Sequence, residues 1–201
     1  MGCSSCETIE IKNERFRKEK EIGNLNFLIR SERTKEDYAY KIIDIRTMKD
    51  EEKIEILNDV ISLKKLDHPN IILVKTAYFS DDKKYLYVIS EYADGGNLQM
   101  KLNEQKQKNK YFDTNTLLDW FMQICFALQY IHSKNILHRN IKPSNIFLMK
   151  QNKENFAKLG DFGVSKVLKS SLKKTKTIIS SVQYQPPEMI EKKDYSFETD
   201  I

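Results

Sequence analysis

The sequence predicts an α+β fold of two lobes, in which a small antiparallel sheet precedes a helical lobe. Short segments of strand-forming residues occupy most of residues 26–92, and a single helical pattern interrupts them. A longer amphipathic pattern, typical of a helix, begins at residue 114. With 201 residues, of which 40% are hydrophobic, the chain is long enough to bury a substantial core.

The strands of the small lobe are expected where β-branched and aromatic residues gather between charged turns. Tyr38, Tyr40, Ile42 and Ile43 are the strand formers of residues 38–45. The other expected strands are residues 26–30, 71–79 and 84–92.

One helix is expected to interrupt the sheet at residues 50–66. Ile54, Leu57, Ile61 and Leu63 are spaced to form one apolar stripe along it. The Asp-His-Pro-Asn sequence that follows Leu66 ends the pattern.

The boundary between the lobes is expected at residues 93–97, a glycine-containing segment typical of a flexible hinge. We assign residues 1–15 to an N-terminal tail and charged arm, 16–92 to the small lobe and 98–201 to the helical lobe. Acidic and basic residues are balanced between residues 7 and 21, five of each, so this stretch is expected to be solvated.

The helical lobe is expected to begin with a long amphipathic helix. Its apolar residues recur every three or four positions through residues 114–133, over about five turns. They are Leu117, Phe121, Ile124, Cys125, Leu128 and Ile131.

Charge and cysteine content exclude several classes of protein. Thirty-four basic and 29 acidic residues give a net charge of +5, which falls short of the basic footprint of a nucleic-acid-binding domain, so no nucleic acid is expected as a partner. No run of about 18 apolar residues is present to span a bilayer. Three cysteines without metal-ligand spacing support neither a disulfide framework nor a zinc site, and a reducing compartment is expected.

Three motifs follow one another in the second half of the chain. His-Arg-Asn-Ile-Lys-Pro-Ser-Asn occupies residues 138–145, Asp161-Phe162-Gly163 begins sixteen positions after Asn145, and Pro-Pro-Glu occupies 186–188. Their order and spacing resemble the catalytic loop, the magnesium motif and the end of the activation segment of protein kinases. The resemblance covers residues 16–201, and the segments 117–148 and 158–168 are most similar to the NIMA-related serine/threonine kinases.

The resemblance implies ATP and Mg²⁺ as cofactors. Phosphoryl transfer is catalysed mainly by positioning and charge neutralisation. Lys41, in a Tyr-Ala-Tyr-Lys sequence similar to the third-strand lysine motif, would hold the α- and β-phosphates. Asn145 and Asp161 would hold the magnesium ions, and Lys142 would lie near the transferred phosphoryl group. Further residues that the resemblance places around the nucleotide are Ile22, Gly23, Ala39, Glu91, Ala93 and Phe147, with the small Ser90 at the pocket behind the adenine.

At the position of the family's catalytic aspartate, the chain has Asn140. A neutral amide accepts a hydrogen bond from a substrate hydroxyl but neither takes its proton nor supplies negative charge. General-base catalysis contributes about 10²–10⁴-fold, so we expect a strongly impaired enzyme, a pseudokinase. The alternative is an atypical active serine/threonine kinase in which Asn140 positions the hydroxyl and the proton leaves late.

Two further departures concern the phosphate lid and the regulatory helix. The glycine-rich loop keeps Gly23 alone, and Lys41 follows it by 18 positions, fewer than is usual in the family. We therefore expect weak or unusual ATP binding, and the alternative interpretation is a plain tight hairpin turn. The expected partner of Lys41 is Asp59, one methylene shorter than the family's glutamate, with Glu55 as a substitute only if the helix slides.

The resemblance makes residues 164–187 an activation segment. They hold five lysines and no acidic residue. Thr177 matches the family's phosphorylation site, Arg139 the arginine that pairs with the phosphate, and Ser181 a residue that positions substrate. The alternative interpretation is a solvated loop with a lysine bias.

The first six residues, Met-Gly-Cys-Ser-Ser-Cys, are similar to an acylation signal. Gly2 would be myristoylated and Cys3 and Cys6 palmitoylated, supplying the two lipids that stable anchoring needs. A cytoplasmic protein at the periphery of a membrane is then expected. The alternative is an unmodified tail, because the sixth residue is cysteine where the motif has serine or threonine.

The last residues, 198–201, stand where kinases begin the central helix of the large lobe, so an incomplete large lobe is expected. Either the chain is a fragment or a partner covers the apolar face of residues 117–131. The predicted function is that of a kinase-family domain, catalytically impaired, acting as a nucleotide-binding or scaffold module. Its partners would be a protein substrate or a regulatory protein, together with the membrane surface.

Overall fold

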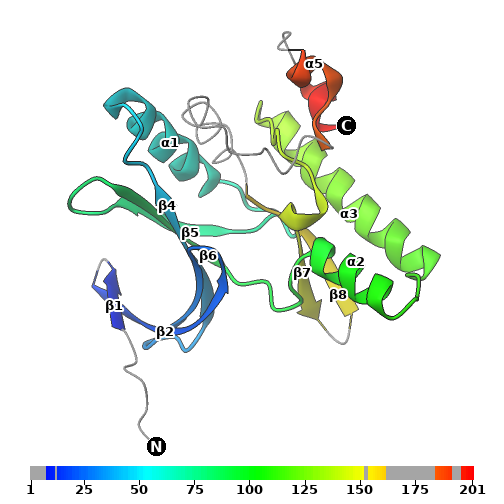
Figure 1. Ribbon diagram of the computed structural model, residues 1–201, viewed down its shortest axis with the longest axis horizontal. Helices are drawn as coiled ribbons and strands as arrows, with labels where there is room; N and C mark the ends of the chain where they lie inside the picture. Colours follow the sequence, from blue (N-terminus) through cyan, green and yellow to red (C-terminus); the bar gives the residue numbers. More distant parts are fainter. Residues whose placement is uncertain (1–7, 12, 152–153, 162–183, 192–195) are drawn as a thin grey trace, which may run out of the picture. The chain divides into compact units, whose positions relative to one another are not determined.

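The computed structural model describes residues 8–11, 13–151, 154–161, 184–191 and 196–201. Two compact units are present (Figure 1). The first consists of residues 1–64 and 73–92, and the second of residues 65–72 and 93–201. Within the described residues, no helix is both long enough and apolar enough to cross a membrane.

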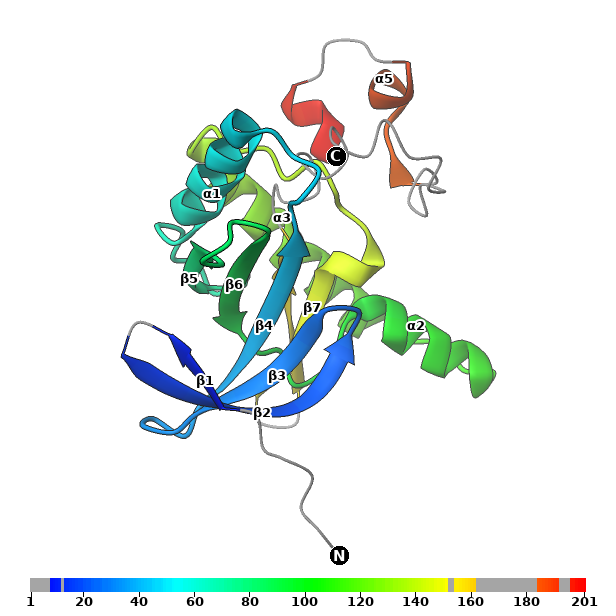
Figure 2. The same cartoon turned by 60° about the vertical axis from the view of Figure 1, so that its left-hand side comes forward.

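The first unit is built on a sheet of six antiparallel strands, in the order β1-β2-β3-β4-β6-β5 (Figure 2). One helix, α1 (Asp50–Leu63), packs against β5. The strands are β1 (Thr8–Ile11), β2 (Glu14–Gly23), β3 (Asn26–Ser31), β4 (Asp37–Asp44), β5 (Val74–Phe79) and β6 (Tyr85–Glu91). The predicted α+β fold, with a small antiparallel sheet, is confirmed.

Strands β1 and β2 occupy most of the stretch expected to be a solvated arm. Ile11 and Phe16 are 4% and 1% exposed and pack with Ile29, Tyr40 and Ile89 in the core of the sheet. The expectation of a solvated arm is wrong, because β1 pairs with β2 and β2 pairs with β3, and one apolar side chain on each of these strands is buried although most of the β2 side chains are charged and exposed. Balanced charge along a sequence therefore does not exclude a strand.

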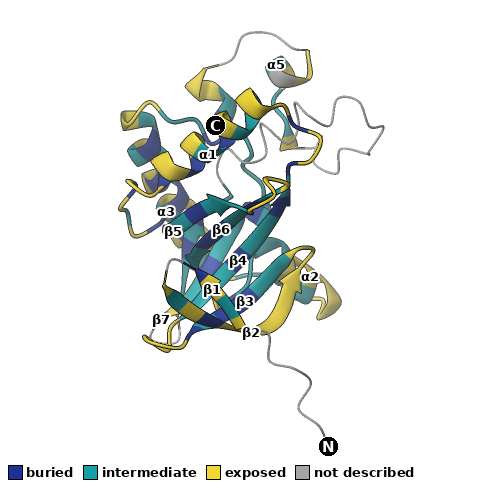
Figure 3. Cartoon of the chain, turned by 90° about the vertical axis from the view of Figure 1, so that its left-hand side faces the viewer, coloured by how far each residue is buried: buried dark blue, intermediate teal, exposed yellow. Residues whose placement is uncertain are grey.

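Helix α1 forms where it was expected, but with another face buried. Its buried residues are Ile56, Val60 and Leu63, whereas Ile54 and Ile61 are 59% and 41% exposed. Buried and exposed positions alternate around the helix (Figure 3). Of the predicted stripe only Leu63 is buried, because two apolar stripes share this helix and the sequence period does not say which one meets the sheet.

The second unit contains α2 (Leu98–Gln107), α3 (Thr114–Ser133), the short helices η1 (Pro143–Asn145), α5 (Pro187–Ile190) and η4 (Phe197–Asp200), and a hairpin of β7 (Ile146–Gln151) and β8 (Glu154–Leu159). The strand expected at residues 71–79 begins only at Val74, so residues 71–73 precede β5. Ile72 belongs to the second unit, and its backbone N–H donates to the Leu159 carbonyl of the same unit at 2.9 Å.

Helix α3 is anchored on the β7–β8 hairpin. The Trp120 Nε1 group donates to the carbonyl of Asn155 at 2.8 Å, and the Ala157 N–H donates to Gln123 Oε1 at 2.6 Å. The two side chains of α3 thus provide hydrogen-bond partners for a carbonyl and an N–H of β8 that do not bond to β7. Trp120, Ile124, Ala127 and Ile131 are the buried residues of the helix.

Candidate functional site

In the first unit, strand β4 separates a core face from a face that carries Lys41. Tyr40 is 5% exposed within the core cluster, against which Tyr38 and Ile42 also pack. Because side chains alternate along a strand, Ala39 and Lys41 lie on the opposite face. Ala39 pairs with Ser90 of β6, and Lys41 with Val88. Ala39 and Lys41, both predicted to contact the nucleotide, thus lie two positions apart on one face of β4, and Ser90 of β6 lies directly beside Ala39.

The predicted phosphate lid is a tight turn between β2 and β3. Gly23 pairs with Asn26, so only Asn24 and Leu25 make the turn. The Leu25 carbonyl accepts a hydrogen bond from the Ile42 N–H at 2.8 Å, which binds the turn to β4. A Cβ on Gly23 would meet nothing closer than 3.5 Å, so no close backbone approach requires this glycine. These observations favour the plain hairpin turn over a glycine-rich lid.

Leu25 has a φ of 55°, in the left-handed region that disfavours residues with a Cβ. We predict that Leu25→Gly raises the free energy of unfolding by about 1 kcal/mol, because glycine adopts this conformation without strain. Urea denaturation measures the change. Asn24→Gly, at a turn position without positive φ, is the control, and an equal gain from both substitutions would contradict strain at Leu25.

Glu91, at the end of β6, is held by the preceding strand region. Its Oε1 accepts from the Leu73 N–H at 2.7 Å, and its own N–H donates to the Leu73 carbonyl at 2.9 Å. The side chain and backbone N–H of Glu91 are thus already occupied within the first unit. Asp59, the predicted partner of Lys41, is an exposed residue of α1.

In the second unit, the predicted hinge pairs with β7. The Gly95 N–H donates to the Leu148 carbonyl and the Leu148 N–H donates to the Gly96 carbonyl, both at 2.8 Å. A Cβ on Gly95 would lie 2.5 Å from the Leu148 oxygen, so only glycine fits there. Ala93 is 7% exposed.

The loop that contains residues 138–145 is organised by the buried carboxylate of Asp200. Its two oxygens accept the backbone N–H groups of His138 and Arg139, each at 2.7 Å. His132 Nε2 lies 3.0 Å from Asp200 Oδ2, and the Asp200 side chain is 0% exposed. Sequence reasoning did not assign a role to Asp200, since it lies 62 positions beyond His138 and only the fold brings the two together.

His138 and Asn145 connect this loop to the segment before Asp161. The buried His138 ring donates from Nε2 to the Gly160 carbonyl at 2.9 Å, and its Nδ1 accepts from the Asn140 N–H at 3.3 Å. The Asn145 Nδ2 group donates to the Asn140 carbonyl at 2.8 Å, and the Gly160 N–H donates to the Asn145 carbonyl at 3.0 Å. The structure thus brings together Asn140, Asn145 and Gly160, the residue before Asp161.

Gly160 and Phe147 are in close contact at the same place. A Cβ on Gly160 would lie 2.9 Å from the Phe147 ring and 2.9 Å from Ile72. Asp161 follows with a φ of 58°, and Arg139 has a φ of 62°. Two non-glycine residues in the left-handed region, both beside one hydrogen-bonded network, are typical of a functional site.

The donor set of this network fits Mg²⁺ better than a transition metal. Nowhere in the described part of the chain do three His, Cys, Asp or Glu side chains gather as a metal site. The Asn145 amide nitrogen is used by Asn140, which leaves the amide oxygen as an acceptor. One amide oxygen and one carboxylate suit Mg²⁺, which usually takes its remaining ligands from water and phosphate.

Two histidines of the second unit have a pKa below the ordinary value of 6.5. Burial lowers the pKa of His138, against the opposing effects of its bond to Gly160 and the carboxylates of Asp200 and Asp161. Burial and the neighbouring Lys158 lower the pKa of His68. In each ring Nδ1 accepts a backbone hydrogen bond, from Asn140 and Asn70 respectively, which protonation would break.

We therefore predict that thermal stability falls as the pH decreases from 7 to 5. Both histidines have a lower pKa in the folded chain than the ordinary value of 6.5, so the unfolded chain binds more protons below that pH. The stabilisation is complete above pH 6.5 and is lost as the pH falls towards the folded pKa values. Melting curves of the native chain and of His138→Gln measure this, and an unchanged pH dependence in the variant would exclude His138 as a source.

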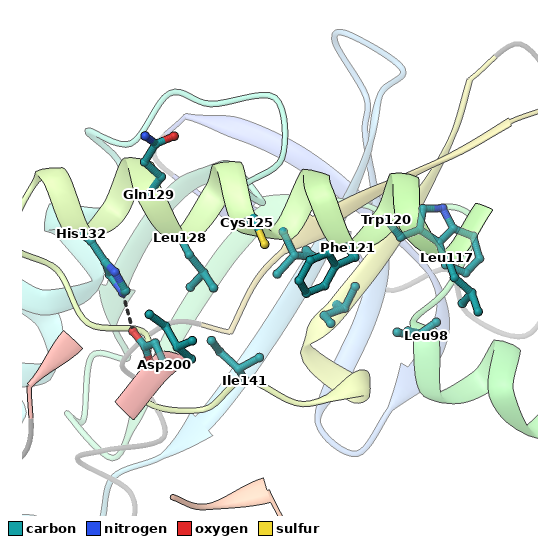
Figure 4. A pocket seen from close by; sticks show the side chains of 13 residues that line it. Leu98, Leu117, Trp120, Phe121, Cys125, Leu128, Gln129, His132, Ile141 and Asp200 are labelled. Atoms are coloured by element: carbon teal, nitrogen blue, oxygen red, sulfur yellow. Dashed lines mark hydrogen bonds and ion pairs between the residues drawn. The ribbon is translucent and has the colours of Figure 1, made fainter. Parts of the chain in front are cut away.

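A groove runs along α3 within the second unit (Figure 4). It has a volume of about 550 Å³. Leu98, Phe121 and Leu128 contribute apolar walls, and the His132–Asp200 pair lies at one end. Of the apolar face expected along residues 117–131, Leu117 and Phe121 are 44% and 64% exposed, whereas Ile124 and Ile131 are buried.

Several predicted site residues lie outside the described residues. They are Gly2, Cys3, Cys6, Phe162, Gly163, Thr177 and Ser181. All three residues of the third motif, 186–188, are described, and Glu188 Oε1 accepts a hydrogen bond from the Thr199 hydroxyl at 3.0 Å.

Comparison with known proteins places this geometry in context. The family model "Protein kinase domain" matches residues 21–201. Serine/threonine-protein kinase Nek1 of Mus musculus is 36% identical over 192 residues, which are 94% of this chain and 15% of Nek1. Probable serine/threonine-protein kinase nek3 of Dictyostelium discoideum is 40% identical over 162 residues, 80% of this chain and 14% of the relative. Serine/threonine-protein kinase Nek5 of Homo sapiens is 38% identical over 161 residues, again 80% of this chain and 22% of the relative. The chain thus spans less than a quarter of the length of each of these proteins.

Proposed function

We propose that this chain, which belongs to the protein kinase family and resembles its NIMA-related serine/threonine members, is a catalytically impaired domain that binds nucleotide and acts as a scaffold or regulatory module. The observation that carries the proposal is Asn140. The loop around it keeps its buried hydrogen bonds through His138, Asn145 and Asp200, while the side chain at the position of the family's general base is neutral.

The retained network supports nucleotide binding. Kinases of this family generally use ATP and Mg²⁺, and Mg²⁺ neutralises phosphate charge when it is bound. Asn145, whose amide nitrogen is held by Asn140, presents its oxygen as one ligand, and Asp161 supplies a carboxylate as the other. Lys41, on the face of β4 opposite the core, supplies a cation for the phosphates. Ile22, Gly23, Ala39, Glu91, Ala93 and Phe147 are the further nucleotide contacts that we propose.

The tight turn at Asn24 and Leu25 supports weak binding. A glycine-rich lid places backbone N–H groups against phosphates, whereas this turn gives its Leu25 carbonyl to Ile42. With fewer phosphate contacts, affinity for ATP should rest mainly on Lys41 and the metal ligands.

Thermal unfolding with and without Mg²⁺-ATP tests this binding. At about 100 times Kd the ligand adds about 2.7 kcal/mol, or about 5–10 °C for a chain of this size. Lys41→Met and Asp161→Asn should abolish the shift, while Lys35→Met, at an exposed lysine of the same unit, should retain it. A cooperative melt that ATP does not move would contradict the nucleotide-binding proposal.

The alternative function is an atypical active kinase. Its support is that both backbone groups of Asn140 are held, the N–H by His138 and the carbonyl by Asn145. In this alternative the side-chain amide oxygen of Asn140 accepts a hydrogen bond from the substrate hydroxyl. Lys142 would then lie beside the transferred group. For control of either function we propose phosphorylation of Thr177, pairing of the phosphate with Arg139, substrate positioning by Ser181 and an ion pair of Lys41 with Asp59.

We also propose acylation of Gly2, Cys3 and Cys6, which would hold a cytoplasmic protein against a membrane and near its protein partners. The support is the Met-Gly-Cys-Ser-Ser-Cys sequence alone. Metabolic labelling with a myristate analogue tests it. Labelling that is lost in Gly2→Ala is expected, and no labelling of the native chain would overturn it.

A further inference from the structure

The C-terminal end of helix α2 carries a group of lysines that no acidic residue balances. Lys106, Lys108 and Lys110 are all exposed. The nearest acidic residue before them, Glu104, pairs with Lys101 at 3.1 Å. Within the described part of the chain, none of the three lysines forms an ion pair. This end of α2 therefore carries three uncompensated positive charges.

The end of the helix gathers these lysines within about one turn. Asn109 has a φ of 50°, and its N–H donates to the Lys106 carbonyl at 3.2 Å. The Lys110 N–H donates to the Gln105 carbonyl at 3.0 Å. These two bonds are those of a Schellman motif, in which the chain turns back over the last helical turn. The three lysines consequently surround the end of the helix, and they do not form a stripe along one side of it.

Tyr111, directly after this motif, lies outside the packed part of the unit. It is 95% exposed. The next residue, Phe112, packs edge-on against Trp120, with ring centroids 5.3 Å apart, and Asp113 is the N-cap of α3. Fixed backbone thus flanks the tyrosine on both sides. Residues 106–111, which we call the α2 tip, lie at the end of α2 that points away from β7 (Figure 2).

We infer that the α2 tip binds the surface of a membrane that contains anionic phospholipids. Lysines attract anionic headgroups as point charges, without a fixed geometry, so charges that surround a projecting helix end suit a charged plane. Tyrosine is enriched at the boundary between headgroups and hydrocarbon, and the exposed ring of Tyr111 provides an apolar contact there. The attachment does not depend on the proposed acylation of Gly2, and it adds the second signal that a single acyl chain needs for stable anchoring.

A nucleic acid or an acidic peptide matches the α2 tip less well. Nucleic-acid recognition uses arginine forks or several aromatic rings on which bases stack, whereas the tip has no arginine and one aromatic ring. Peptides dock in grooves or along sheet edges, whereas the side chains of the tip all stand exposed on a projecting helix end. The shape, the charge and the aromatic residue together favour the membrane.

Co-sedimentation with lipid vesicles tests the inference on the full chain with Gly2→Ala, Cys3→Ala and Cys6→Ala, which removes the proposed lipid sites. We expect this unacylated chain to bind vesicles with about 30% phosphatidylserine about 10²-fold more tightly than pure phosphatidylcholine vesicles, because each lysine near an anionic surface contributes about fivefold. The excess should vanish at about 1 M salt, where the Debye length is about 3 Å.

Two triple variants with equal loss of charge separate the α2 tip from the net charge of the chain. Replacing the three lysines of the tip with glutamine should abolish the excess binding and leave the melting temperature unchanged, because these side chains form no ion pair within the described part of the chain. The control is Lys35→Gln/Lys64→Gln/Lys65→Gln, at exposed lysines elsewhere, and it should bind like the unacylated chain.

Tyr111→Trp shows whether the tip touches lipid. The native chain has one tryptophan, Trp120, which is 6% exposed, so a tryptophan at position 111 reports on the tip. Its fluorescence should shift to the blue on anionic vesicles and be quenched by brominated lipids, and the unacylated chain without this substitution should show neither change. No excess binding to anionic vesicles, equal binding by the two triple variants, or a tryptophan that shifts with polyuridine RNA and not with vesicles would each overturn the inference.

Discussion

Replacing Asp200 with alanine is expected to lower the free energy of unfolding by about 2–4 kcal/mol. The Asp200 carboxylate is buried and accepts the backbone N–H groups of His138 and Arg139, both at 2.7 Å. Alanine would leave these donors without their acceptor, and an unmade buried hydrogen bond costs more than a made one contributes. Urea denaturation followed by circular dichroism measures the loss.

Two variants separate this role from the general effect of removing a carboxylate. Asp119→Ala, at an exposed position of α3, should change the stability by less than about 0.5 kcal/mol. Asp200→Asn keeps one acceptor oxygen and should fall between Asp200→Ala and the native chain. A loss in Asp200→Ala no larger than in Asp119→Ala would mean that Asp200 does not hold the loop.

Replacing Asn140 with aspartate is expected to raise the rate of phosphate transfer by about 10²–10⁴-fold. The substitution changes one amide to a carboxylate of nearly the same shape. The backbone bonds of residue 140, to the His138 ring and to the Asn145 amide, do not depend on its side chain. The restored carboxylate can take the proton of a substrate hydroxyl, which the amide cannot. Transfer from labelled ATP to a generic substrate such as casein is the measurement.

The Lys41→Met substitution serves as the control in the Asn140→Asp background. It should return transfer to the level of a sample without protein, because Lys41 is the proposed cation for the phosphates. Equal transfer by the native chain and Asn140→Asp, above the level of a sample without protein, would show that residue 140 does not limit the reaction. No transfer by either protein would contradict the atypical active kinase.

Sequence reasoning predicted the family, and the match of residues 21–201 to the protein kinase domain confirms it. This was possible because the motif residues contact one another within short segments of the chain, so that their spacing in the sequence already indicates the contacts. Asn140 and Asn145 are five positions apart and joined by a hydrogen bond. The 20-residue helix α3 was equally predictable, because its apolar period persists over its whole length.

Other features depend on contacts between residues that are far apart in the sequence, and a local sequence pattern does not reveal such contacts. The two strands at residues 8–23 were obscured because charged residues fill their exposed positions, although Ile11 and Phe16 are buried. Helix α1 offered two apolar stripes, and only packing against β5 decided between them. Asp200 acts on His138 across 62 positions, and a lone aspartate near a motif gives no signal of such a contact.

The measurement that tests the central proposal most directly is ATP binding and phosphate transfer in one sample of the native chain. Equilibrium dialysis with labelled Mg²⁺-ATP gives the bound fraction, and the label recovered on protein gives the transfer. We expect bound ATP that Lys41→Met removes, and transfer at least 10²-fold below the roughly 1–100 s⁻¹ that is typical of kinases. Transfer by the native chain at rates within that range would contradict catalytic impairment by Asn140.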